Sequence, residues 1–84
     1  MRIEEIREKI DEIDGELMPL LAKRFALAKE AGEEKKRLAL PVTDGAREKK
    51  ILDKINGFGF ATDIENVLYN LYSEIFIFSK ELEE

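Results

Sequence analysis

The first half of the chain carries an apolar seam with the spacing of an α-helix. Between Arg2 and Arg37, apolar side chains recur in alternating steps of three and four residues, at Ile3, Ile6, Ile10, Ile13, Leu17 and Leu20. Such steps place side chains on one face of a helix, and an unbroken series is typical of a helix packed lengthwise against another. The same spacing continues through Arg24, Leu27 and Ala31. One position of the seam is therefore an arginine.

Gly15 and Pro19 interrupt this helical pattern. In a helix interior, glycine costs about 1 kcal/mol and proline about 3 kcal/mol relative to alanine. Pro19 also lacks the N–H that would donate to the carbonyl of residue 15. Two interpretations are open: one long helix kinked near Pro19, or two helices separated at Asp14-Gly15. The seam keeps its phase across both residues, which favours the single kinked helix.

A second helix is predicted to begin near Asp44. Pro41 prevents the first helix from running on, and either Thr43 or Asp44 can cap the new N-terminus. Gly57 is placed to end this helix.

A third helix is predicted from Thr62 onward. Residues 62–65 have the pattern of a capping box, and apolar residues follow at helical spacing as far as Leu82. Phe58 and Phe60, in the loop between the second and third helices, are expected to pack against the core.

The length of the first helix predicts more than one copy of the chain. About 36 residues at a rise of 1.5 Å span roughly 54 Å, whereas a compact domain of 84 residues has a radius of gyration near 12 Å. One such domain cannot cover the seam from end to end, but a second copy can. The sequence therefore predicts an all-α fold in one domain, residues 1–84, with three helices per protomer in an intertwined homodimeric bundle.

Composition restricts the chemistry of this domain. The chain has no Cys and no His, which excludes disulfides, a thiolate nucleophile and an imidazole base, and makes a zinc site improbable. The formal net charge of −5 argues against binding of nucleic acid. The longest apolar run, near residues 75–78, is too short to cross a bilayer, and the N-terminal residues lack the apolar region of a signal peptide. We therefore expect a cytoplasmic protein that works without a metal or cofactor.

Four polar residues lie in or beside the apolar stripes: Arg24, Lys35, Glu48 and Ser79. Each has an ordinary structural explanation, such as a cation whose stem alone is buried or an acid near a helix N-terminus. Together they describe a walled pocket for an anion. Arg7 lies seventeen residues before Arg24, about 100° around the helix, so it cannot share that face in the same chain.

The chain resembles the all-helical chorismate mutase family over nearly its whole length. The resemblance rests on IREKIDEID at 6–14, LLAKRFALAKEAGEEKK at 20–36, LPVTDGAREKKIL at 40–52 and the last helix through Ser79. It implies an isomerase that converts chorismate to prephenate in the shikimate pathway, toward the aromatic amino acids Phe and Tyr. It also implies an interlocked dimer with each site shared between the two chains.

The resemblance assigns roles to the cations first. Arg24 and the partner subunit's Arg7 would grip the two carboxylates of chorismate, for which the planar guanidinium is suited. Lys35 would donate to the ether oxygen whose bond breaks and help to hold a carboxylate. Arg47 would support the network around the ring hydroxyl.

The remaining implied roles fall to acids and a hydroxyl. Glu48, with Asp44, would accept from the ring hydroxyl, and Ser79 would hydrogen-bond a carboxylate. Glu83 stands where many members have a Gln that donates to the ether oxygen, and some members have Glu there. Gly45-Ala46 replaces the more usual Pro-acid pair. The implied catalytic residues are Lys35, Arg24 and Glu83.

Two alternatives share this scaffold. An isochorismate-pyruvate lyase uses a similar cationic site. A regulatory or dimerisation module would keep the fold without catalysis, and would tolerate Leu or Met at Arg24 and Lys35.

Overall fold

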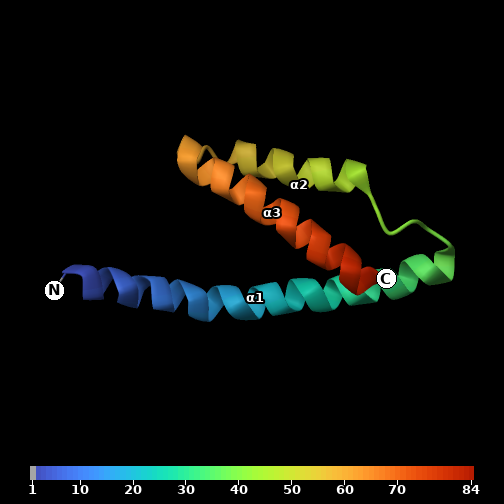
Figure 1. Cartoon of the computed structure of the whole chain (residues 1–84), viewed down its shortest axis with the longest axis horizontal. Helices are drawn as coiled ribbons and strands as arrows, with labels where there is room; N and C mark the ends of the chain where they lie inside the picture. The colour runs from blue at the N-terminus through green and yellow to red at the C-terminus, as the bar shows by residue number, and fades with distance from the viewer. Residues whose placement is uncertain (1) are drawn as a thin grey trace.

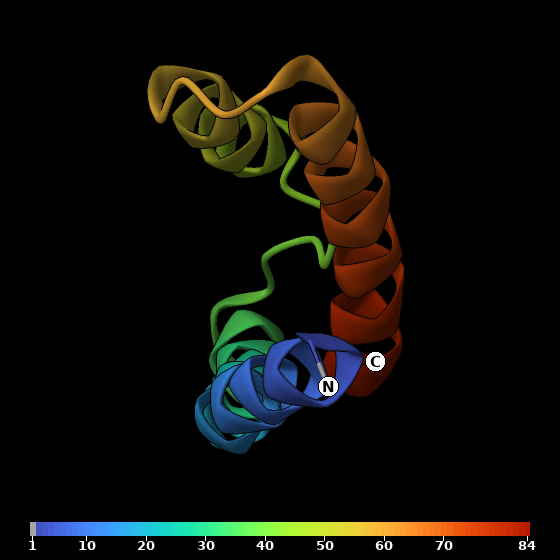
Figure 2. The same cartoon turned by 90° about the vertical axis from the view of Figure 1, so that its left-hand side faces the viewer.

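The computed structural model describes residues 2–84, which form three helices: α1 (Arg2–Leu38), α2 (Gly45–Gly57) and α3 (Thr62–Glu83) (Figure 1). Within these residues there is no strand, as the sequence predicts. The C-terminal end of α3 meets the C-terminal half of α1, and α2 packs on α3 without contacting α1. Viewed along α1, the helices form an open C with α3 as its back (Figure 2).

The first helix is continuous, and the interpretation with two helices is wrong. Gly15 and Pro19 both lie inside α1, which bows gently in Figure 1. Both residues are exposed, so water can bind the carbonyl of Gly15 that Pro19 leaves without its helical donor. The molecule is 56 Å along its longest axis, which is the length expected for this helix.

A left-handed residue ends α1. Ala39 has a φ of 56°, and the N–H of Leu40 donates to the carbonyl of Lys35 at 2.8 Å. This is the geometry by which helices commonly stop, although glycine is the usual residue at the left-handed position. The chain then turns at Pro41 toward α2.

The two remaining N-termini differ in their caps. Asp44, one of the two predicted candidates, caps α2 by accepting from the N–H of Arg47 at 3.1 Å. The capping box predicted at residues 62–65 is wrong: Ala61 is the N-cap of α3, and no side chain caps it. Because Thr62 is already helical, it cannot take the extended conformation that a capping residue needs. The Glu65 side chain instead accepts from the hydroxyl of Tyr69 at 2.7 Å.

The prediction that Phe58 and Phe60 pack against the core is wrong for the single chain. Their side chains are 72% and 41% exposed, and the two rings stack on each other with centroids 5.2 Å apart. Gly59 between them has a φ of 70°, which glycine adopts without strain. The two rings follow α2, which packs on α3 and has no contact with α1.

The buried apolar core is small. Ile55, Ile75 and Phe76 are the buried hydrophobic residues of the described chain. Much of the α1 seam is exposed instead, with exposed fractions of 41–60% at Ile3, Ile6, Ile10, Ile13 and Leu17. None of the helices within residues 2–84 combines the length and apolar character needed to cross a membrane.

Candidate active site

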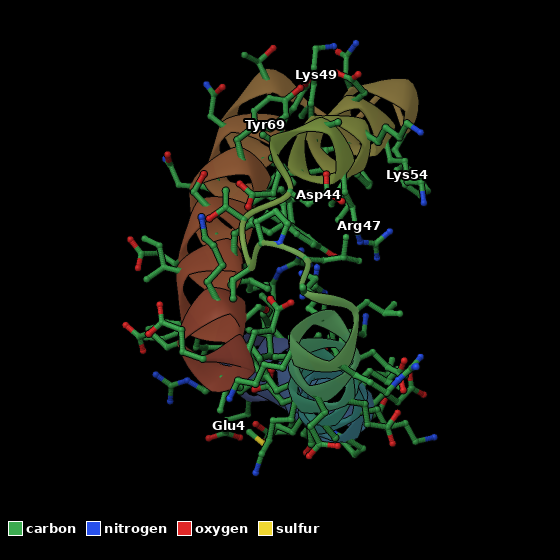
Figure 3. The ribbon with its side chains drawn as sticks, turned by 90° about the vertical axis from the view of Figure 1, so that its right-hand side faces the viewer. Glu4, Asp44, Arg47, Lys49, Lys54 and Tyr69 are labelled. Carbon is green, nitrogen blue, oxygen red and sulfur yellow. The ribbon has the colours of Figure 1, made fainter. Side chains whose placement is uncertain are left out.

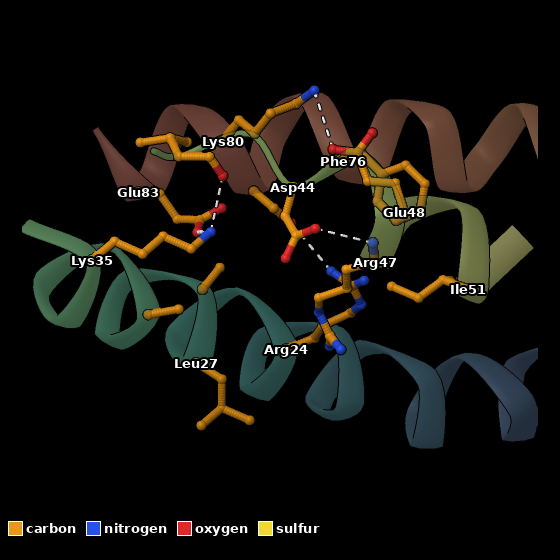
Figure 4. Close-up of a pocket in the computed structure, with 14 residues that line it drawn as sticks. Arg24, Leu27, Lys35, Asp44, Arg47, Glu48, Ile51, Phe76, Lys80 and Glu83 are labelled. Carbon is orange, nitrogen blue, oxygen red and sulfur yellow. Dashed lines mark hydrogen bonds and ion pairs between the residues drawn. The ribbon is translucent and has the colours of Figure 1, made fainter. Parts of the chain in front are cut away.

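A pocket of about 280 Å³ lies where the C-terminal half of α1, the start of α2 and the last turns of α3 converge (Figure 4). Its apolar lining includes Leu27, Ala28, Ala31, Val42, Ile51 and Phe76. Its polar lining comprises Arg24, Lys35, Asp44, Arg47, Glu48, Ser79, Lys80 and Glu83. Polar groups set in an apolar wall can orient a small polar ligand.

Arg24 joins α1 to α3 at one wall of the pocket. Its Nη1 donates to Oγ of Ser79 at 3.1 Å, and its guanidinium lies over the ring of Tyr72, 5.7 Å from the centroid. Ser79 is buried and Tyr72 half-buried. Two contacts from a neighbouring helix therefore fix the guanidinium while leaving other N–H groups to donate to a ligand.

Lys35 lies about three turns further along α1 and faces the same space. Its Nζ donates to the carbonyl of Val42 at 2.9 Å and forms an ion pair with Oε1 of Glu83. Glu83 is 8% exposed. The structure places Glu83, next to the end of the chain, in the pocket lining.

Gly32 explains how the end of α3 comes so close to α1. A Cβ built on Gly32 would lie 2.5 Å from the carbonyl oxygen of Glu83 and 2.6 Å from its Cα. Only a residue without a side chain allows this approach. Gly32 was missed from the sequence, where the available signal was a glycine inside a predicted helix, in which glycine is costly.

The start of α2 supplies the opposite wall. Asp44 and Arg47 lie at the end of α2 near the pocket, and Glu48 follows in the first turn (Figures 3 and 4). The carboxylate of Glu48 forms an ion pair with Nζ of Lys80 at 3.3 Å. Lys80 is a pocket residue that the sequence analysis missed. It falls beside Ser79 in the chain, where the pattern indicates an ordinary surface charge.

The pocket is positively charged in an acidic chain. Its lining contains four cationic side chains and three carboxylates, a formal charge of +1, whereas the whole chain carries −5. Outside the pocket, the hydrogen bond to Glu65 raises the pKa of the Tyr69 hydroxyl. The pocket is thus suited electrostatically to an anion.

Comparison with known proteins identifies the family. A profile described as chorismate mutase type II matches residues 6–84. The chain belongs to the chorismate mutase type II family. The chorismate mutase of Methanocaldococcus jannaschii is 48% identical over 54 residues, which are 64% of this chain and 54% of that protein. The bifunctional chorismate mutase/prephenate dehydratase of Aquifex aeolicus is 43% identical over 53 residues, 63% of this chain and 15% of that protein. This chain thus spans about half the length of the first relative.

Solved structures agree with the family. The form II chorismate mutase structure from Thermus thermophilus superposes with a TM-score of 0.88 at 30% identity, over 99% of this chain and 94% of that one. A conserved hypothetical protein from Pyrococcus furiosus gives a TM-score of 0.82 at 28% identity, over 100% and 97%. The all-helical fold predicted from the sequence is the fold of this family.

Seven of the eight residues that the resemblance assigns to the site line this one pocket: Arg24, Lys35, Asp44, Arg47, Glu48, Ser79 and Glu83. The eighth, Arg7, does not. It is exposed on α1, seventeen residues before Arg24, which is about 26 Å along the helix. The catalytic and binding roles of all eight residues stay predictions.

Proposed function

We propose that this protein rearranges chorismate to prephenate in aromatic amino acid biosynthesis. The observation that carries the proposal is the pocket that gathers Arg24, Lys35, Glu48, Ser79 and Glu83 from three helices, with a positive formal charge. Chorismate carries two carboxylates and a ring hydroxyl, and these groups match guanidinium, ammonium and carboxylate partners. A cytoplasmic location, without cofactor or metal, stays a prediction.

The reaction needs no nucleophile, which suits a chain without Cys or His. The rearrangement is intramolecular: the ether C–O bond breaks as a new C–C bond forms within the same molecule. The protein must hold a compact conformer and stabilise negative charge on the departing ether oxygen. Hydrogen-bond donors in fixed positions achieve both.

We assign the role of these donors to Arg24 and Lys35. The Arg24 guanidinium, fixed by Ser79 and Tyr72, offers paired N–H groups to a carboxylate. Nζ of Lys35 has three N–H groups, of which one donates to Val42 and one pairs with Glu83. The third is left to donate to the ether oxygen as charge develops there.

The other wall would bind the ring hydroxyl. An ionised Glu48 accepts hydrogen bonds and cannot donate them, so it suits the hydroxyl hydrogen of the substrate. Asp44 and Arg47 border the same wall at the start of α2. This arrangement would set the orientation of the ring between the two sets of partners.

A homodimer completes the proposal. The apolar residues of α1 from Ile3 to Leu17 are 41–60% exposed, a long apolar face with no helix of the same chain on it. Burial of such a face against a second copy is favourable. The pocket has a formal charge of only +1 for a dianionic substrate, and the partner subunit's Arg7 would supply the further cation.

The primary test is turnover of chorismate by the purified chain. We expect chorismate to disappear and prephenate to form, while isochorismate assayed in parallel yields no pyruvate. Pyruvate release from isochorismate alone would indicate the lyase instead. Inertness toward both compounds, in a protein shown to be folded, would indicate a non-catalytic module.

Complementation tests the shared site. Arg7→Ala and Arg24→Ala should each be nearly inactive, because each damages both sites of a homodimer. A heterodimer of the two has one doubly damaged site and one intact site, so co-refolding should restore part of the activity. The absence of recovery, once heterodimers are shown by mass, would contradict a site built from two chains.

A further inference from the structure

We infer that Lys80 is a positioning residue of this site, which orients the Glu48 carboxylate toward the substrate and offsets its charge. The inference rests on the proposed function, because it assigns Glu48 to the ring hydroxyl of chorismate. Lys80 was not among the residues that the family resemblance assigns. The ion pair of Lys80 with Glu48 and its place in the pocket lining are the observations that carry the inference.

The Lys80–Glu48 ion pair joins α2 to α3. Helix α2 packs on α3 and does not contact α1, which carries Arg24 and Lys35. The position of Glu48 relative to these cations therefore depends on how α2 docks on α3. Across residues 2–84, the Lys80–Glu48 contact is the one hydrogen bond or ion pair that joins α2 to α3. It is therefore the contact by which α3 can set the direction of the Glu48 carboxylate.

Because the Lys80–Glu48 pair is partly buried, it fixes the geometry of its side chains better than an exposed surface pair does. The side chains of Lys80 and Glu48 are 30% and 28% exposed, whereas those of Lys49 and Asp53, paired at 3.1 Å along α2, are 78% and 65% exposed. Fully exposed pairs are screened by water and contribute little. A largely covered pair holds its geometry better, because fewer water molecules compete for either group.

Charge gives Lys80 a second effect on the same group. The pocket lining has four cations and three carboxylates, so without Lys80 it would be formally neutral. A bare Glu48 carboxylate would then repel the carboxylates of an approaching dianion. Paired with Lys80, Glu48 can accept from a hydroxyl while its repulsion of the substrate is offset. We therefore expect Lys80 to act mainly on substrate binding.

The test is a double-mutant cycle on chorismate turnover. Lys80→Met keeps the length of the stem and removes the charge, and Glu48→Gln removes the charge of its partner. We expect Lys80→Met to raise KM about three- to tenfold and to lower kcat less than about threefold, the range of one covered ion pair. Lys80→Arg should stay within about twofold of the parent protein, because it keeps the positive charge on a stem of similar length.

The effect of Lys80→Met on kcat/KM, measured with and without Glu48→Gln, shows whether Lys80 acts through Glu48 or independently of it. If Lys80 acts through Glu48, adding Lys80→Met to Glu48→Gln should change kcat/KM less than about twofold. If the two factors simply multiply, Lys80 acts independently of Glu48 and the inference is overturned. Lys49→Met is the matched control, because it removes a lysine from an exposed pair whose residues do not line the pocket (Figure 3). It should leave kcat and KM unchanged.

Failures of the two proposals can be told apart. Parent protein that turns over chorismate, with Lys80→Met equal to it in kcat and KM, overturns the role of Lys80 and leaves the function standing. Folded parent protein that neither binds nor converts chorismate overturns both. Thermal unfolding is recorded for every variant, and Lys80→Gln replaces Lys80→Met in the cycle if the methionine variant does not fold.

Discussion

The two halves of α1 share one helical spacing but have different surroundings. The C-terminal half contributes Arg24 and Lys35 to a polar pocket, and at Gly32 it meets the end of α3. The N-terminal half has no helix of the same chain against it, and its seam residues are all apolar. An apolar seam is complementary to another apolar helix face, whereas a seam interrupted by an arginine is suited to binding a polar ligand. We therefore expect substitutions in the two halves of α1 to have different consequences.

Breaking the N-terminal half of the seam should abolish the dimer. Ile10→Asp places a carboxylate in the middle of the face that we expect the second copy to cover, where its desolvation would oppose association. Light scattering should then return about the chain mass of 9.7 kDa, instead of about twice that mass for the parent protein. Because each pocket would lose the partner subunit's Arg7, kcat/KM should fall by more than about a hundredfold.

The control introduces an aspartate at a position of α1 outside the apolar seam. Glu12 lies on the side of α1 away from Ile10 and Ile13, so Glu12→Asp should leave both mass and activity unchanged. An Ile10→Asp protein that remains dimeric and active would show that this half of α1 does not form the interface.

Adding one methyl group to each half of α1 should have opposite consequences. In the C-terminal half, the Cβ of Gly32→Ala would collide with backbone atoms of Glu83 at 2.5–2.9 Å, so the end of α3 must move. We expect kcat/KM to fall about tenfold and the melting temperature to drop, since overpacking typically costs 1–3 kcal/mol. Assays of turnover and thermal unfolding check both effects.

Gly15→Ala is the matched change in the N-terminal half. A Cβ there meets no atom of the chain within 4 Å. Alanine is the better helix former, so Gly15→Ala should stabilise the protein by up to about 1 kcal/mol and leave kcat/KM unchanged. If Gly32→Ala were as active and as stable as Gly15→Ala, close contact at Gly32 would not be needed to place Glu83.

Local signals in the sequence predicted the helices well. The bounds of α2 follow from the cap at Asp44 and the stop at Gly57, and the unbroken phase of the seam identified α1 as one helix across Pro19. The N-cap of the third helix could not be predicted from local signals. The sequence pattern favoured Thr62, but α3 begins at Thr62 and its N-cap is Ala61. The exposure of Phe58 likewise depends on which helices reach the loop, and the sequence pattern does not specify that.

The site was predicted where a polar residue breaks an apolar stripe. Arg24, Glu48 and Ser79 were found for that reason, and the pocket contains all three. Gly32 and Lys80 were missed because their importance arises between helices. Gly32 matters through the backbone of Glu83, and Lys80 through the carboxylate of Glu48 on another helix. Neither partner can be inferred from the periodicity of one helix.

The smallest expected effect concerns the last turn of α3. An ionised Glu83 offers only acceptors, so it would repel the ether oxygen as negative charge grows there, whereas a protonated Glu83 can donate one O–H. We therefore predict that an amide donor in place of the Glu83 carboxylate makes the reaction faster. Glu83→Gln keeps the size of the side chain and supplies an amide donor at every pH.

Glu83→Gln should raise kcat/KM at neutral pH by about two- to tenfold, the range of one hydrogen bond. Loss of the ion pair would also leave Lys35, still bonded to Val42, with another N–H to donate to the substrate. The measurement is kcat/KM of both proteins at neutral pH. Glu84→Gln, one residue further along and outside the pocket lining, is the control and should equal the parent protein. If kcat/KM of Glu83→Gln also equalled that of the parent protein, Glu83 would have no part in the reaction, and its ion pair with Lys35 would serve only to hold α3 against α1.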